Sequence, residues 1–133
     1  MQTHEVQILK EFIFEELSVS FRSDGLVAVS IHSDNEVEIK HVLEVVSALK
    51  EYGKGKKFPL LITTQKYTLP SPEARAYIAT AESDPFASAE AYVTQSFSQR
   101  LVGNVYMQFN KPARPTRIFN SEAKAIEWLK TFL

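Results

Sequence analysis

The chain has 133 residues, of which 44% are hydrophobic and 23% charged, and its net charge at pH 7 is −1. A chain of this size fits one globular domain that buries roughly two-thirds of its unfolded surface. Because it contains no cysteine, disulfide frameworks, thiolate metal sites and cysteine nucleophiles are excluded. The near-neutral charge argues against the concentrated basic face of a nucleic-acid-binding protein.

The N-terminus shows no targeting pattern. The stretch MQTHEVQILKEF lacks the positive region and apolar run of a secretory signal. No apolar run in the chain approaches the ~20 residues of a membrane span. We therefore expect a cytoplasmic protein with no membrane span.

Two interpretations stay open for residues 1–17. The apolar residues with helical spacing are Val6, Leu9, Ile13 and Leu17, whereas those that fit a strand are Phe12 and Phe14. We treat this segment as an N-terminal extension of uncertain structure.

The next segment predicts a β-hairpin with one buried face. Apolar residues alternate with smaller or polar ones on both sides of the turn Asp24-Gly25, at Leu17, Val19, Phe21, Val27, Val29 and Ile31. Period-two alternation around an Asp-Gly turn is typical of paired antiparallel strands.

Helical and extended patterns then alternate. From about 38 to 52 the apolar spacing is helical, and Gly53 ends the predicted helix. The apolar run KFPLLITT, residues 57–64, predicts a central strand. A second helix, reaching about residue 80, begins where Ser71 suits the N-cap and Pro72 the first helical position.

The last third of the chain continues this alternation. A half-buried strand is predicted at 89–93, and Ser96 with Gln99 matches a capping box for a helix over roughly 97–109. Its apolar residues form a stripe, Phe97, Leu101, Val105 and Phe109, widened by Val102 and Tyr106. A short strand at 115–119 precedes a final helix capped by Asn120 or Ser121.

This order predicts a two-layer α/β domain over residues 1–133. We expect a mixed sheet of about five strands, in which the hairpin is followed by right-handed β-α crossovers. About four helices should lie mainly on one face of the sheet, leaving the other face to water or to a partner.

Five stretches resemble the STAS-like domains of the anti-sigma-factor-antagonist type. They are DGLVAVSIH, GKGKKFPLLITT, SPEARAYIA, SQRLVGNVYMQFNKPARPTRIF and SEAKAIEWLKTF, which together span roughly residues 18–132. The chain is especially similar to small uncharacterised bacterial proteins described as STAS/SEC14-like. The resemblance implies a non-enzymatic regulatory module that docks onto another protein, and its SEC14-like side implies a carrier or sensor of a small apolar or lipidic ligand.

In antagonists of this type, phosphorylation of a serine at the start of the second helix controls docking. The resemblance places that serine at Ser71, with Arg75 one turn further along the helix. The neighbours Pro70 and Pro72 depart from the antagonist pattern, which has an aspartate before its serine and small residues after it. Ser71 is therefore better interpreted as a plain N-cap.

The stretch NKPARPTRIF, residues 110–119, places basic side chains beside two prolines. We interpret it first as a solvated connector between a helix and the last strand. The alternative is an anion or partner contact, with candidate residues Arg100, Asn104, Lys111, Arg114 and Arg117.

No enzyme signature is present. The chain has no nucleophile elbow and no phosphate-binding loop at a strand-to-helix turn, so no catalytic or cofactor-binding residue is predicted. His4, His32 and His41 lack the spacing of metal ligands and are expected at the surface or the domain boundary.

Two hypotheses of function follow. In the first, the domain binds a protein partner or a second copy of itself, as a homodimer. In the second, it holds a small apolar ligand in a pocket whose candidate lining is Phe97, Tyr106, Phe109 and Trp128. The spacing of these four residues fits a dry core better than a pocket.

Overall fold

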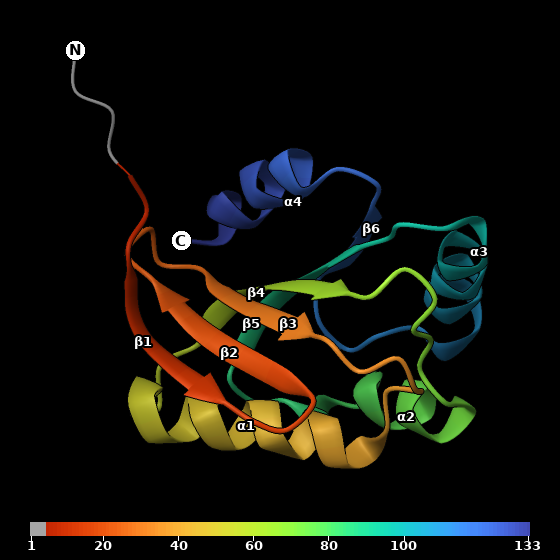
Figure 1. Cartoon of the computed structure of the whole chain (residues 1–133), viewed down its shortest axis with the longest axis horizontal. Coiled ribbons are helices and arrows are strands. Elements are labelled where there is room, and N and C mark those ends of the chain that lie inside the picture. Colours follow the sequence, from red (N-terminus) through yellow and green to blue (C-terminus); the bar gives the residue numbers. More distant parts are fainter. Residues whose placement is uncertain (1–4) are drawn as a thin grey trace.

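A computed structural model describes residues 5–133, which form one six-stranded mixed sheet with helices on both faces (Figure 1). The strands are β1 (Ile8–Ile13), β2 (Leu17–Arg22), β3 (Val27–Ile31), β4 (Phe58–Thr64), β5 (Ala87–Val93) and β6 (Thr116–Phe119). The α-helices are α1 (Ile39–Gly53), α2 (Pro72–Ile78), α3 (Phe97–Val105) and α4 (Glu122–Leu129). Shorter helical turns are η1 (Ala81–Ser83), η2 (Tyr106–Asn110) and η3 (Lys130–Phe132). His4 lies outside the described residues.

The strands follow one another across the sheet in chain order. The pairs β1–β2 and β2–β3 are antiparallel, and β3, β4, β5 and β6 are parallel. Each parallel connection therefore steps in the same direction, so right-handed crossovers place α1, α2 and α3 on one face. The helix α4 follows the last strand and covers the other face (Figure 1). The predicted α/β class, with its hairpin and crossovers, is confirmed.

The segment left open by the sequence contains the strand β1. Phe12 pairs with Val19 of β2, and Phe12 and Phe14 pack against the core on the α1 side. Three other apolar residues of β1, Ile8, Leu9 and Ile13, are exposed. Among the described residues the sheet thus has six strands, one more than the number expected.

Each face of the sheet has its own apolar core. On the α1–α2–α3 face, the central strands contribute Leu17, Val19, Phe21, Val27, Val29, Ile31, Leu60 and Ile62. On the α4 face the core is Leu26, Leu61, Ala89, Ala91, Ala125 and Leu129. Strand β4 is buried on both faces, as its continuous apolar run predicts.

Serine caps begin three of the described helices. The hydroxyl oxygens of Ser71, Ser96 and Ser121 accept hydrogen bonds from the amides of Ala74, Gln99 and Lys124, at 3.0, 3.2 and 3.3 Å. A side-chain oxygen at the N-cap satisfies an amide that has no partner within the helix. The predicted starts of α2, α3 and α4 are confirmed by these contacts.

Helix α3 presents a different face to the protein from the one that the apolar stripe indicates. Phe97 and Phe109 are 70% and 71% exposed. The inward face instead carries Gln99, Gly103 and Tyr106. The side-chain nitrogen of Gln99 donates to Thr64 Oγ1 and to the carbonyl oxygens of residues 65 and 68, at 2.7–3.0 Å. These hydrogen bonds fix the rotation of α3 about its axis.

Candidate functional site

A cavity of about 140 Å³ lies between the sheet and the helices α1, α2 and α3. Most of its wall is apolar and comes from the strands and from α1, α2 and α3, with Val29, Ile31, Val45, Leu60, Ile62, Ile78 and Val102 among the lining residues. One part of the wall is polar and carries Ser83, Asp84, Glu90, Tyr92 and Tyr106. Further polar residues of the lining are His41, Thr64, Thr68, Arg75, Thr94 and Gln99, so the cavity is a largely apolar chamber whose acidic side chains are gathered in one part of the wall.

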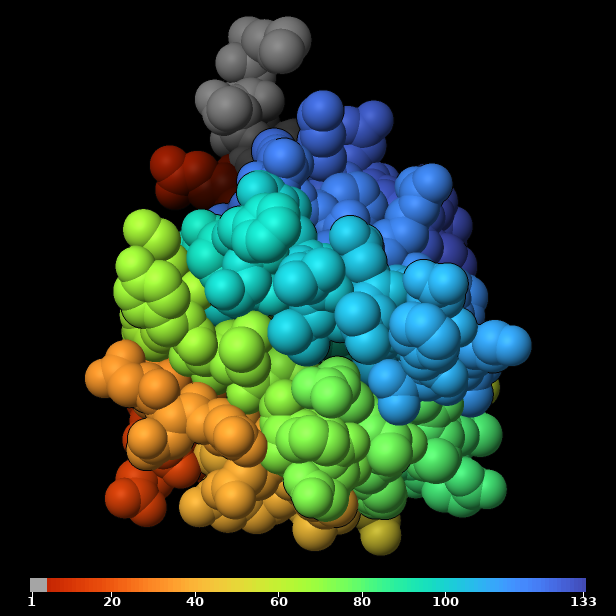
Figure 2. Space-filling model, turned by 90° about the vertical axis from the view of Figure 1, so that its right-hand side faces the viewer, coloured from red at the N-terminus to blue at the C-terminus, as the bar shows by residue number. Residues whose placement is uncertain are grey.

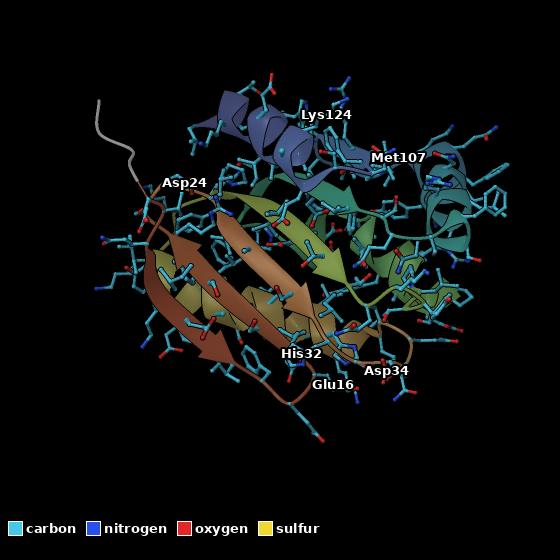
Figure 3. All side chains as sticks on the ribbon, turned by 45° about the horizontal axis from the view of Figure 1, so that its top comes forward. Glu16, Asp24, His32, Asp34, Met107 and Lys124 are labelled. Carbon is cyan, nitrogen blue, oxygen red and sulfur yellow. The ribbon has the colours of Figure 1, made fainter. Side chains whose placement is uncertain are left out.

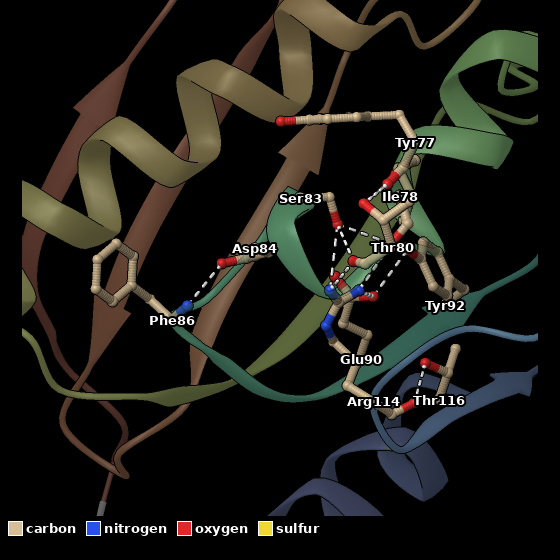
Figure 4. Close-up of polar contacts among 10 residues, drawn as sticks. All are labelled: Tyr77, Ile78, Thr80, Ser83, Asp84, Phe86, Glu90, Tyr92, Arg114 and Thr116. Atoms are coloured by element: carbon tan, nitrogen blue, oxygen red, sulfur yellow. Dashed lines mark hydrogen bonds and ion pairs between the residues drawn. The ribbon is translucent and has the colours of Figure 1, made fainter.

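Behind this polar wall lies Arg114, which comes from the loop before β6 (Figure 4). Its guanidinium donates to the carbonyl oxygens of Ile78 and Thr80 at 2.8 and 2.7 Å, and to Ser83 Oγ at 3.2 Å. It also forms an ion pair of 3.2 Å with Glu90. Arg114 therefore ties the C-terminal end of α2 and the turn η1 to strand β5.

Two buried carboxyl groups line the cavity near this one guanidinium. Glu90 lies on β5, and Asp84 accepts a hydrogen bond of 3.1 Å from the amide of Phe86. Burial raises the pKa of Glu90 to about 7, against the opposing effect of Arg114, and the nearby Asp84 raises it further. The pKa of Asp84 is also raised, chiefly by burial. Because one guanidinium faces two carboxyl groups, Asp84 and Glu90 retain a proton more readily than exposed carboxyl groups would.

Two tyrosines complete the polar wall, and their rings meet edge to face at 6.2 Å. The Tyr92 hydroxyl donates to Glu90 Oε1 at 3.3 Å. The Tyr106 side chain is buried, and its hydroxyl has no hydrogen-bond partner among residues 5–133. Tyr106 begins η2, a π-helical turn that continues α3, and π-helical turns frequently occur at functional sites.

The candidate phosphosite has a structural role at the start of α2. Ser71 is buried, and its hydroxyl oxygen is occupied by the amide of Ala74. Arg75 donates to the carbonyl oxygen of Pro70 at 3.1 Å. Both side chains thus hold the first turn of α2 in place.

The five candidate anion contacts lie apart from one another. Arg100 and Asn104 are exposed on α3, and Lys111 is exposed at the end of η2, where its φ is 52°. The Arg117 guanidinium lies 5.6 Å from the centre of the Trp128 ring, on the α4 side. The Arg114 side chain is buried, so the prediction that it lies on a solvated rim is wrong. Its guanidinium is held inside by the ion pair with Glu90 and by hydrogen bonds to carbonyl oxygens.

The four residues of the candidate apolar pocket are also separated. Tyr106 lines the cavity, whereas Phe97 and Phe109 point to the surface. Trp128 packs against Phe119 and Phe132 on the opposite face of the sheet. The sequence offered no signal for Glu90 or Asp84, whose acidic side chains are typical of exposed positions.

The outward face of α3 and η2 carries an apolar ridge, which we define as Phe97, Leu101, Val105 and Phe109. All four side chains are exposed. They follow one another at intervals of four residues, so they lie along one side of the helix. Figure 2 shows this face, where α3 appears in cyan above the green surface of α2. A contiguous row of large exposed apolar side chains is typical of a docking surface.

A second polar contact lies at the start of α1, where His41, which also lines the cavity, meets Glu16. His41 Nδ1 accepts the Glu38 amide at 2.9 Å, so Nε2 carries the proton that it shares with Glu16 Oε1 at 3.0 Å. Glu16 lies at the same end of the sheet as His32 and Asp34, and opposite Asp24 (Figure 3). Hydrogen bonds from Ser33 and His41 lower the pKa of Glu16 to about 2. His41 is therefore buried as the third residue of α1 and part of its capping box, not at the surface.

Other site classes find no support in the described part of the chain. Residues 5–133 contain no group of three or more histidine, aspartate or glutamate side chains arranged to hold a metal ion. Within the same residues, no helix has the length and apolar character needed to cross a membrane.

Comparison with known proteins gives one family match and one similar solved structure. The profile of a family described as "Domain of unknown function (DUF7793)" matches residues 20–133. No curated protein matches. The chain is similar to the crystal structure of an uncharacterized protein of the DUF3478 family with a SpoIIAA-like fold from Shewanella loihica PV-4. The two are 14% identical with a TM-score of 0.51 over 97% of each chain, which confirms the STAS-like resemblance at the level of the fold.

Proposed function

The chain belongs to the DUF7793 family, and we propose that it is a non-enzymatic regulatory module that acts by docking through the ridge of α3. We further propose that a second copy of the chain is the molecule that binds there. The observation that carries the proposal is the exposure of the ridge. No other part of residues 5–133 covers its four large apolar side chains.

The order of side chains along the ridge supports self-association. In an antiparallel pairing about a two-fold axis that crosses the outer side of α3 level with residue 103, Phe97 meets Phe109 of the other copy and Leu101 meets Val105. Aromatic residues then pack at both ends and aliphatic residues in the middle. A two-fold interface requires this kind of self-complementary surface, and rows of side chains four residues apart are the ridges by which helices commonly pack.

Charge along the flanks is compatible with the same arrangement. The exposed neighbours Ser98, Asn104 and Gln108 are uncharged. Arg100 lies three residues from the proposed axis, so it is separated from its counterpart by six residues of helix, about 9 Å along the axis. Screening at physiological salt weakens repulsion between exposed charges at that distance. The ridge is short, so we expect a weak dimer that depends on concentration.

Sedimentation equilibrium over a range of protein concentrations tests the proposal. The unmodified chain should dimerise, and Leu101→Glu should be monomeric because it places a charge in the centre of the ridge. The matched control is Leu43→Glu on α1, since Leu43 and Leu101 are both 53% exposed. It should dimerise like the unmodified chain. A chain that stays monomeric at hundreds of micromolar, or equal loss in both variants, would contradict docking of a second copy through α3.

A further inference from the structure

We propose that the cavity beneath α2 and α3 is a binding site for a small uncharged molecule with an apolar body and one hydroxyl group, and that the Tyr106 hydroxyl is its hydrogen-bond partner. Two observations carry this proposal. The cavity has a largely apolar wall, and Tyr106, one of the residues that line it, is only 6% exposed and has a hydroxyl that lacks a partner within residues 5–133.

The size of the cavity limits the ligand. Its volume of about 140 Å³ is below the roughly 300–1,000 Å³ of pockets that hold drug-sized ligands. It is close to the ~150 Å³ of an engineered apolar cavity in another protein that binds benzene. The site therefore suits a molecule with a body the size of one aromatic ring, and it is too small for a whole lipid chain.

The other polar groups of the wall already have partners. The Gln99 amide is bound to the loop after β4, the Thr68 hydroxyl donates to Ser33 O at 2.7 Å, and both His41 nitrogens are engaged. A buried hydroxyl without a partner destabilises the folded chain, and a ligand hydroxyl would relieve that cost. Tyr106 is thus the group that would select a hydroxyl-bearing ligand over a plain hydrocarbon.

The charges near the cavity favour a neutral ligand. Asp84 and Glu90 in its wall would repel an anion, and Arg114 is already bound to Glu90 and to backbone carbonyl oxygens. A cation would lose its hydration in a chamber whose wall is mostly apolar. A hydroxyl group avoids both costs.

The site has a route to solvent. Figure 2 shows a narrow opening where the green atoms of α2 meet the cyan and blue atoms of α3 and η2. Tyr106 lies in the π-helical turn on this side.

Fluorine NMR with 4-fluorophenol and fluorobenzene tests the site on the full chain. The unmodified chain should bind 4-fluorophenol. Tyr106→Phe, which keeps the ring, should bind it about tenfold more weakly, while the affinity for fluorobenzene should stay within about twofold. The charged probes 4-fluorobenzoate and 4-fluorobenzylamine should bind more weakly than 4-fluorophenol.

A second variant tests the location. Val102→Phe fills the cavity from α3 and should abolish binding of both neutral probes, with folding verified by circular dichroism. The monomeric variant Leu101→Glu should bind 4-fluorophenol like the unmodified chain, because its change lies on the outer side of α3. The proposal is overturned if no neutral probe binds, if Tyr106→Phe leaves 4-fluorophenol binding unchanged, or if a charged probe binds more tightly.

Discussion

The Arg114 guanidinium lies 3.2 Å from Glu90 Oε1, and both side chains are buried. The same guanidinium also binds the carbonyl oxygens of Ile78 and Thr80, which leave the C-terminal end of α2. One side chain from the loop before β6 therefore satisfies acceptors on two other elements. Buried charges are tolerated when they are paired and hydrogen-bonded in this way.

Removing Arg114 should strongly destabilise the fold. Arg114→Ala leaves a buried carboxyl and two carbonyl oxygens without their donor, so we expect the free energy of unfolding to fall by about 3–5 kcal/mol. Urea titration followed by tryptophan fluorescence measures this loss. The control is Arg117→Ala, which removes an exposed guanidinium over Trp128 and should cost about 0.5–1 kcal/mol. Equal losses in the two variants would show that the buried pair adds no stability.

Stability should fall as the pH rises from about 4.5 to about 7. The pKa of Glu90 is raised by burial from 4.5 to about 7, so in this range the folded chain binds more protons than the unfolded chain. The stability linked to this proton is fully present below pH 4.5 and is lost as the pH passes about 7. The difference corresponds to about 3 kcal/mol, and the raised pKa of Asp84 acts in the same direction.

Urea titrations at several pH values between 4.5 and 8 measure this dependence. Glu90→Gln should remove most of the slope, because its amide does not titrate. Glu82→Gln changes an exposed carboxyl in η1 and serves as the control, with the slope unchanged. If Glu90→Gln retains the full slope, another group titrates in this range and the raised pKa of Glu90 is wrong.

The sequence predicted the architecture because its signals are local. The alternation around Asp24-Gly25, the apolar run of β4 and the serine caps each depend on neighbouring residues. Strand β1 stayed open between a helix and a strand in the sequence, because an edge strand pairs with a neighbour along only one of its two sides. Its exposed Ile8, Leu9 and Ile13 disturb the period-two pattern that Phe12 and Phe14 would otherwise show.

The site was less predictable because it depends on contacts between distant residues. Glu90 and Arg114 are 24 residues apart, and an acid or an arginine is read as exposed unless its partner is known. On α3, the row of phenylalanine, leucine and valine suggested a core face, whereas Gln99 turns that row outward through bonds to residues 64–68. No sequence pattern within α3 could indicate that Gln99 forms hydrogen bonds with a different loop.

Ser71 should act as the N-cap of α2. Ser71→Ala removes the acceptor for the Ala74 amide and should lower the free energy of unfolding by about 1 kcal/mol. Ser71→Asp keeps a capping oxygen and should lose less. Ser98→Ala, at an exposed position within α3, is the control for loss of a hydroxyl. If Ser71→Asp and Ser71→Ala differ in self-association but not in stability, Ser71 is a regulatory position and not only a cap.

Glu16 should make the fold sensitive to strong acid. Its pKa is lowered from 4.5 to about 2 by hydrogen bonds from Ser33 and His41, so its contribution to stability is present above pH 4.5 and is lost as the pH falls through about 2. Glu16→Gln should therefore lose stability relative to the unmodified chain at pH 6, and the two should converge toward pH 2. Thermal unfolding at both pH values measures this. Glu15→Gln, which changes an exposed neighbour, should follow the unmodified chain at every pH; a constant difference for Glu16→Gln across the range would show that packing, not ionisation, gives Glu16 its role.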